Sequence, residues 1–284
     1  MISIEFGSKK RGDFDISSDK DMLIIGDNIT QLIESKERRK IEGYSVSITT
    51  TNKAKYMIDK GSLFFKHIID EGELIEGNRE EHLEIFGNWM PALDYQDEID
   101  SNIDLLEILY YVPKTIEGVL AATDIVTISI RNILIRKLAS FGLYVFSWEK
   151  VTSMAEKYNI ISLNEKIILL HARQIKNYYR KGYFLQVSVF FLIRLMDILC
   201  GILSDKICFR FGTKKEIIQL YEKYRDGSYK QLRALELLCA YYGFSSSPPK
   251  FVKWIKDPNF FCLTKSLDFQ IDQKARSGIA LCYA

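Results

Sequence analysis

The stretch FGSKKRGDFDISSDKDMLI, residues 6–24, decides the fold of the first part of the chain. An alternating segment, residues 2–6, leads into it, and the short apolar run over residues 22–25 is ended by Gly26. Alternating or short apolar runs bounded by glycine predict β-strands. Residues 7–18 between these runs are polar and include two glycines. We therefore expect two neighbouring strands joined by a loop.

The loop and the second strand carry a Gly-Ser turn and an Asp-x-Asp pair. Gly7 and Ser8 are followed, after ten residues, by Asp19 and Asp21. Alternate residues of a strand share a face, so the two carboxylates can bind Mg²⁺ (or Mn²⁺) together. Gly7 lets the backbone approach a phosphate, and the Ser8 hydroxyl can donate to its oxygens. The pattern predicts Asp19 and Asp21 as catalytic metal ligands that stabilise charge when a hydroxyl attacks an α-phosphate and pyrophosphate leaves.

This spacing resembles the signature of the DNA polymerase β-like nucleotidyltransferase superfamily. The string Gly-Ser-x-x-Arg-Gly-Asp-x-Asp-x-x-Ser-Asp-x-Asp, residues 7–21, is similar to its minimal and defence-associated bacterial members, the CBASS and Hailong synthases. The resemblance implies an α+β fold, with a nucleotidyltransferase domain built on a small mixed sheet and a following all-helical domain that closes the cleft. It also implies nucleotide contacts from Arg11 and Ser18, although both can equally be structural, one bracing a carboxylate and the other capping the loop. A solvated charged loop without a ligand is the alternative to the whole motif.

One departure from the resembled pattern concerns a third carboxylate. Members of the superfamily commonly supply it from a later strand, but the strand predicted at residues 44–50 contains no acid. Glu42 lies just before that strand and Glu5 lies on the first strand, and neither has the expected placement. Two-metal chemistry is therefore less well supported than one-metal binding, and a nucleotide-binding protein without turnover is an alternative.

A second segment, residues 61–72, also resembles the defence-associated members. Lys66 is expected to contact nucleotide, and Lys66 and His67 could reach a triphosphate or a base. A helix that turns Leu63, Phe64, His67 and Ile68 to one side is more simply a packed helix, because a lone histidine on an apolar face is usually a core residue. The structural interpretation of His67 is the preferred one.

Strands and helices alternate until about residue 77, and the periodicity is then helical. Apolar residues three and four apart predict helices over residues 103–110, 115–140, 147–157, 164–181, 183–203, 214–223 and 229–242. We expect three regions: a catalytic domain over residues 1–85, a helical bundle over 86–204 and a helical extension over 205–284. Trp254, Phe260 and Phe261 suggest that the extension is packed or forms an oligomer contact.

Composition gives only broad limits. The 284 residues include 39 Lys and Arg against 37 Asp and Glu, so the net charge of +2 does not favour a strongly basic nucleic-acid binder. Five widely spaced cysteines without a CxxC pair fit a reducing compartment. The start of the chain lacks a signal-peptide pattern, so we expect a cytoplasmic protein.

Residues 183–203 are long enough to span a membrane, but Arg194 and Asp197 favour a buried core helix in which the two can pair.

Within the helical part, residues 164–181 are the most suggestive of function. Arg173, Lys176, Arg180 and Lys181 alternate there with Tyr178 and Tyr179, which is a pattern that could hold a nucleotide chain by charge and stacking. A charged, solvated helix face explains it equally well. A ribonuclease of the HEPN type is disfavoured, because His171 is not preceded by arginine at the required spacing.

The leading hypothesis is a Mg²⁺-dependent transferase that uses a nucleoside or deoxynucleoside triphosphate. The resemblance implies a nucleotide or oligonucleotide product that signals in antiviral defence, with a separately encoded effector as an option. A homo-oligomer is a further option, and the charges within residues 183–203 lead us to expect no membrane insertion. An antitoxin-type enzyme that attaches AMP to a protein is a second hypothesis. A non-catalytic nucleotide-binding regulator is the third.

Overall fold

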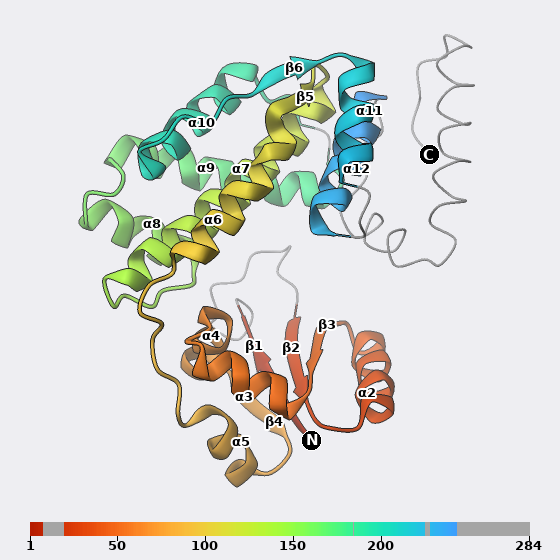
Figure 1. Ribbon diagram of the computed structural model, residues 1–284, viewed down its shortest axis with the longest axis vertical. Coiled ribbons are helices and arrows are strands. Elements are labelled where there is room, and N and C mark those ends of the chain that lie inside the picture. The colour runs from red at the N-terminus through yellow and green to blue at the C-terminus, as the bar shows by residue number, and fades with distance from the viewer. Residues whose placement is uncertain (8–19, 184, 225–227, 243–284) are drawn as a thin grey trace. The chain divides into compact units, whose positions relative to one another are not determined.

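The computed structural model describes residues 1–7, 20–183, 185–224 and 228–242. This part of the chain divides into two compact units, which are coloured along the sequence in Figure 1. The sheet unit holds residues 1–98 and 135–151, and the helical unit holds residues 99–134 and the described residues from 152 onward. The combination of one larger sheet with many helices agrees with the predicted α+β class. The domain boundaries at residues 85 and 204 stay predictions.

A four-stranded mixed sheet with the order β3-β2-β1-β4 forms the centre of the sheet unit. Its strands are β1 (Ile2–Phe6), β2 (Lys20–Ile25), β3 (Tyr44–Thr49) and β4 (Glu73–Glu76). β1 pairs antiparallel with β2 and β4, whereas β2 pairs parallel with β3. The strands expected at residues 2–6, 22–25 and 44–50 are thus confirmed. β4 was not expected, because it is only four residues long, begins and ends with glutamate, and is mostly exposed.

Both faces of this sheet are covered. Ile2, Ile4 and Phe6 of β1 pack with Leu23 and Ile25 of β2 against apolar residues of α3 (Thr51–Asp59), α4 (Leu63–Glu71) and α5 (Arg79–Phe86). On the other face, Met22 and Ile24 pack with Leu32 of α2 (Ile29–Ile41) and with residues of β3. Figure 1 shows α3 and α4 crossing one face and α2 lying beside β3. Because successive strand residues point to opposite faces, β2 is buried on both sides and its register is fixed.

The chain continues mainly in helices, most of which lie where the apolar periodicity predicted them, although the start of the first helix, residues 96–102, was not expected to be helical. These helices are α6 (Gln96–Leu105), the 3₁₀ helix η1 (Leu106–Tyr110), α7 (Ile116–Ser140), α8 (Trp148–Lys157), α9 (Leu163–Arg180), α10 (Val189–Leu203), α11 (Lys214–Lys223) and α12 (Tyr229–Tyr241). The expectation of an all-helical second part was wrong in one detail. β5 (Tyr111–Pro113) and β6 (Arg210–Gly212) pair in parallel and link two distant parts of the chain.

The helix expected at residues 183–203 is present in a shorter form, α10. α10 begins only at Val189, where Ser188 accepts a hydrogen bond from the Phe191 amide, and its 15 residues are fewer than a membrane span requires. Arg194 and Asp197 form the expected ion pair at 3.5 Å. Among the described residues, α7 alone is long and apolar enough to cross a membrane by length and composition, and 83% of its most apolar window is buried within the structure.

Candidate functional site

The end of β1 meets the start of β2 at Gly7 and Asp21. Phe6, the last residue of β1, is the register partner of Asp21. Gly7 follows with a φ of +92°, a backbone conformation that residues with a side chain rarely adopt. A Cβ at Gly7 would lie 2.6 Å from Oδ2 of Asp21, closer than the two atoms can approach. The glycine is therefore needed for both its conformation and the room it leaves beside the carboxylate.

Gly7 gives a direct prediction about this close approach. Gly7→Ala is expected to lose about 1 to 2 kcal/mol of stability from the positive φ and, in addition, to displace the Asp21 carboxylate. Gly43→Ala is the matched control, because Gly43 also has a positive φ, +87°, but a Cβ there meets nothing within 4 Å. Urea unfolding and Mg²⁺ titration of both variants measure the two effects. Equal loss of Mg²⁺ affinity in both variants would contradict the assigned role of Gly7.

Asp21 shares its side of the sheet with the α3–α5 layer. Leu23, two residues further along β2, packs in the same cluster as Phe6, so the alternation of the strand turns Asp21 toward that side. In the parallel pairing of β2 and β3, the partner of Asp21 is Ser45, whose side chain is exposed. Ser45 thus occupies the position on the neighbouring strand where a third carboxylate would stand beside Asp21.

The two other acids considered for a third ligand lie elsewhere. Glu5 is paired with Met22, which packs on the opposite face of the sheet from Leu23. Glu42 follows α2 and forms an ion pair of 2.8 Å with Arg39. That pairing, together with a bond from Arg39 to Glu76, raises the pKa of the Arg39 guanidinium, and the Glu42 hydrogen bond is the largest cause. Neither acid is therefore a partner for Asp21.

Four predicted site residues lie outside the described residues: Ser8, Arg11, Ser18 and Asp19. Gly7, Asp21 and Lys66 are the predicted site residues that the structure places. Within residues 1–7, 20–183, 185–224 and 228–242, no group of three or more His, Cys, Asp or Glu side chains is arranged to hold a metal ion. Asp19 lies outside these ranges, so the roles of Asp19 and Asp21 as a pair of metal ligands stay a prediction.

Lys66 lies on α4 and is held by neighbours in the same unit. Its Nζ is 2.6 Å from Oδ1 of Asp70, one helical turn further on. The ammonium also lies 5.1 Å from the ring centroid of Trp89 and 5.3 Å from that of Tyr144. A cation at these distances is attracted to the faces of both rings. These contacts are sufficient to explain Lys66 as a structural residue of this unit. Its contact with a nucleotide stays a prediction.

His67 is one of the residues of α4 that contact the end of β1. Its ring meets Phe6 edge-on at a centroid distance of 5.6 Å and stacks on Phe146 at 4.6 Å. Its Nε2 is 2.6 Å from Oε2 of Glu71. The structural interpretation of His67 agrees with these contacts. His67 packs on Phe6 immediately before Gly7, and Phe146 packs on His67, so these rings help to hold the end of β1 that carries Gly7.

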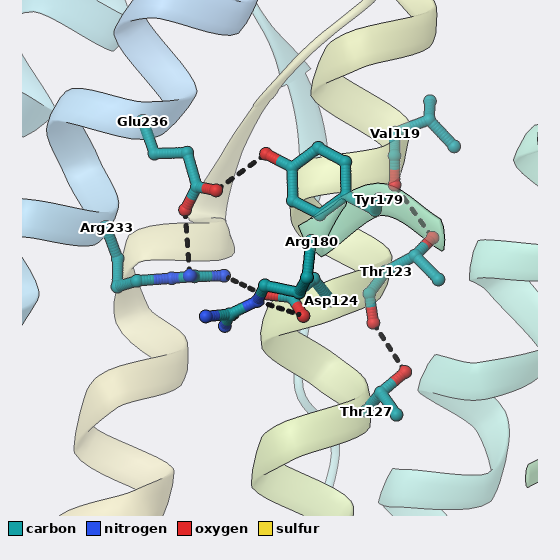
Figure 2. Close-up of polar contacts among 8 residues, drawn as sticks. All are labelled: Val119, Thr123, Asp124, Thr127, Tyr179, Arg180, Arg233 and Glu236. Carbon is teal, nitrogen blue, oxygen red and sulfur yellow. Dashed lines mark hydrogen bonds and ion pairs between the residues drawn. The ribbon is translucent and has the colours of Figure 1, made fainter. Parts of the chain in front are cut away.

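The basic and aromatic residues of α9 do not form one surface. Tyr179 is buried and donates a hydrogen bond of 2.6 Å from its hydroxyl to Oε1 of Glu236. Arg180 makes two hydrogen bonds to the carboxylate of Asp124, at 3.0 and 2.7 Å, as Figure 2 shows. Tyr178 is 50% exposed. The stretch that was considered for nucleotide stacking is therefore divided between an internal polar network and the solvent.

Comparisons with known proteins found no matching family model, no matching curated protein and no matching solved structure.

Proposed function

We propose that this protein is a metal-dependent nucleotidyltransferase whose site is centred on Gly7 and Asp21. The observation that supports the proposal is the space left at Gly7, where a Cβ would collide with the Asp21 carboxylate. A glycine has no side chain to hold a phosphate away from the backbone, and the adjoining carboxylate offers the oxygen ligands that Mg²⁺ prefers. The end of β1 and the start of β2 therefore bring together a backbone position that a phosphate can approach and a carboxylate that can bind Mg²⁺.

The proposed reaction is the transfer of a nucleoside monophosphate. An acceptor hydroxyl forms a new bond to the α-phosphorus of a nucleoside triphosphate, the bond to the β-phosphate oxygen breaks, and pyrophosphate leaves. Asp21 and Asp19 would hold the metal ion, which would supply positive charge beside the reacting phosphate oxygens. Gly7 and Ser8 orient the phosphate chain. Phe6 and His67 keep the end of β1 in place and exclude water from the side of α4.

The experiment is a product assay with each of the four ribonucleotides and four deoxyribonucleotides, labelled at the α-phosphate, in the presence of Mg²⁺. The expected result is a new labelled species whose mass identifies the nucleotide and the acceptor. A nucleotide chain or ring would support the further proposal of a signal molecule in antiviral defence, which rests on the resemblance of the motif. Label on the protein fraction would instead support attachment of AMP to a protein. Recovery of intact substrate from all eight nucleotides would overturn the proposal.

A second candidate function is a nucleotide-binding regulator without turnover. Ser45 favours it, because a hydroxyl stands at the register position beside Asp21 where a third acid would complete a two-metal site. In this case nucleotide binds, no product forms with any nucleotide, and binding persists when the carboxylates of Asp19 and Asp21 are removed.

Ser45→Asp tests whether Ser45 stands beside a metal ion bound at Asp21. Adding a carboxylate beside Asp21 is expected to tighten Mg²⁺ binding about tenfold, because charge count is a main determinant of divalent-cation affinity. Ser47→Asp is the matched control, since Ser47 lies on the same side of β3 but pairs with Leu23 further from Gly7. Mg²⁺ titration by calorimetry measures the change. If both variants bind Mg²⁺ equally well, Ser45 does not stand at the metal site.

A further inference from the structure

One side of α10 carries a stripe of exposed residues. The exposed members of this helix are Phe190, Ile193, Arg194, Asp197 and Gly201. Because successive residues of an α-helix are turned by about 100°, these five positions fall within about 100° of one another around the axis. They therefore form a single surface, the α10 face.

Much of the α10 face is apolar. The side chain of Phe190 is 79% exposed, and that of Ile193 is 37% exposed. α9 packs beside α10 in the helical unit (Figure 1), and its Ile167 is 58% exposed. His171, one turn further along α9, meets the ring of Phe191 edge-on at a centroid distance of 5.2 Å. The apolar surface thus continues from α10 onto α9, and exposed apolar side chains that gather in one patch mark interaction sites.

Gly201 is the smallest member of the α10 face. A glycine inside a helix destabilises it relative to alanine. Its φ is not in the positive region that favours glycine. A Cβ at this position would meet nothing within 4 Å among the described residues. Neither backbone conformation nor packing within the described part of the chain therefore requires a glycine here, whereas a second helix can approach the bare backbone closely.

The large, small and charged members of the α10 face are arranged symmetrically about one point. Arg194 and Asp197 lie at equal distances along the helix from the midpoint between residues 195 and 196, and so do Phe190 and Gly201. Two copies of α10, packed antiparallel about a twofold axis through that point, bring Arg194 of each copy opposite Asp197 of the other. The same axis brings Phe190 of each copy opposite Gly201 of the other. One opposed pair is complementary in charge and the second is complementary in size.

We infer that the α10 face is the contact surface between two copies of this chain, which pack through antiparallel α10 helices about a twofold axis. A symmetric dimer requires a surface that matches itself in this way, with every contact made twice. Within one copy, Arg194 and Asp197 form an ion pair of 3.5 Å whose side chains are more than half exposed, so both are accessible to a second copy. The contact also removes the ring of Phe190 from water.

The first test is sedimentation equilibrium of the full chain over a range of concentrations, in which a reversible equilibrium between monomer and dimer is expected. Gly201→Leu should weaken dimerisation about tenfold or more, because the added side chain occupies the space that Phe190 of the second copy fills. The substitution should not lower the unfolding midpoint, since leucine favours the helix and a Cβ there has room. Lys215→Leu is the matched control, because it adds leucine at an exposed helical position outside the α10 face, and it should change the affinity less than twofold.

Charge reversals test the twofold arrangement. Arg194→Asp sets two acids against each other between copies, and Asp197→Arg sets two arginines against each other. Each variant alone is therefore expected to associate about tenfold more weakly. An equimolar mixture of the two variants should form a mixed dimer about as tightly as the unsubstituted chain dimerises, because every opposed pair then has opposite signs. Unfolding of each variant should change little, because the ion pair within one copy is exposed.

Three outcomes would overturn the inference: a chain that stays monomeric over the whole range, equal weakening by Gly201→Leu and Lys215→Leu, or charge-reversed variants that associate no better mixed than alone. A monomer would show that another segment of the chain or a different protein covers the α10 face. The inference is independent of the proposed transferase, because the mass is measured without nucleotide and Asp21→Asn should dimerise normally. Failure of nucleotide transfer by an intact dimer would overturn only the proposed function.

Discussion

Asp21→Asn is expected to lower the rate of nucleotidyl transfer by about 100-fold or more, because loss of one preorganised electrostatic contact to the reacting phosphate has effects of this size. The amide has nearly the same shape as the carboxylate and does not collide with Gly7 more than Asp21 does. It lacks the negative charge that a hard cation requires. Rates of product formation at saturating Mg²⁺ and nucleotide measure the effect.

The control for Asp21→Asn is Asp59→Asn in the same unit. Asp59 is exposed at the end of α3 and lies outside the Gly-Ser and Asp-x-Asp motif. Its substitution should leave the rate within twofold of the unsubstituted chain. Urea unfolding of both variants separates loss of chemistry from loss of folding. A normal rate for Asp21→Asn in folded protein would remove Asp21 from the catalytic machinery.

Asp124→Asn is expected to destabilise the helical unit by about 3 to 5 kcal/mol, the usual result of removing one partner from a buried ion pair. Arg233 of α12 is fully buried and would keep its charge after losing the carboxylate of Asp124, with Glu236 as its remaining ion pair among the described residues. Arg180 would lose one of its two hydrogen bonds, because the amide keeps only one oxygen that can accept. Urea unfolding followed by far-ultraviolet circular dichroism measures the change.

Asp197→Asn is the matched control for this second substitution. Asp197 also forms an ion pair within a helix, with Arg194, but both side chains are more than half exposed. Exposed pairs contribute about 0 to 1 kcal/mol, so its loss should be small. Comparable destabilisation by the two substitutions would show that Asp124 does not hold the three helices together.

Local patterns were sufficient to predict most elements of the fold. Residues 2–6 and 22–25 alternate or run apolar between glycines, and they form β1 and β2. β4 was missed because Glu73 and Glu76 leave no apolar alternation at an exposed edge strand. β5 and β6 were missed for another reason. They are three residues each, and they pair across about a hundred residues of sequence, which no local pattern reports.

Only the part of the candidate site that is formed by residues close together in the sequence could be predicted. The Gly-Ser and Asp-x-Asp spacing predicted that Gly7 and Asp21 come together, and Phe6 and Asp21 are register partners in the structure. No signal in the sequence indicated that Phe146 would stack on His67. Asp124, between the threonines of an apolar helix, gave no indication that Arg233 was its partner. Such contacts depend on how distant helices pack.

The most direct test of the site at Gly7 and Asp21 is the Mg²⁺-dependent release of pyrophosphate from the eight nucleoside triphosphates. We expect pyrophosphate release with at least one nucleotide and no release in the presence of EDTA. The rate of release should fall about 100-fold in Asp21→Asn but not in Asp59→Asn. Pyrophosphate release that is equal in the unsubstituted chain and in Asp21→Asn, or its absence with all eight nucleotides, would contradict it.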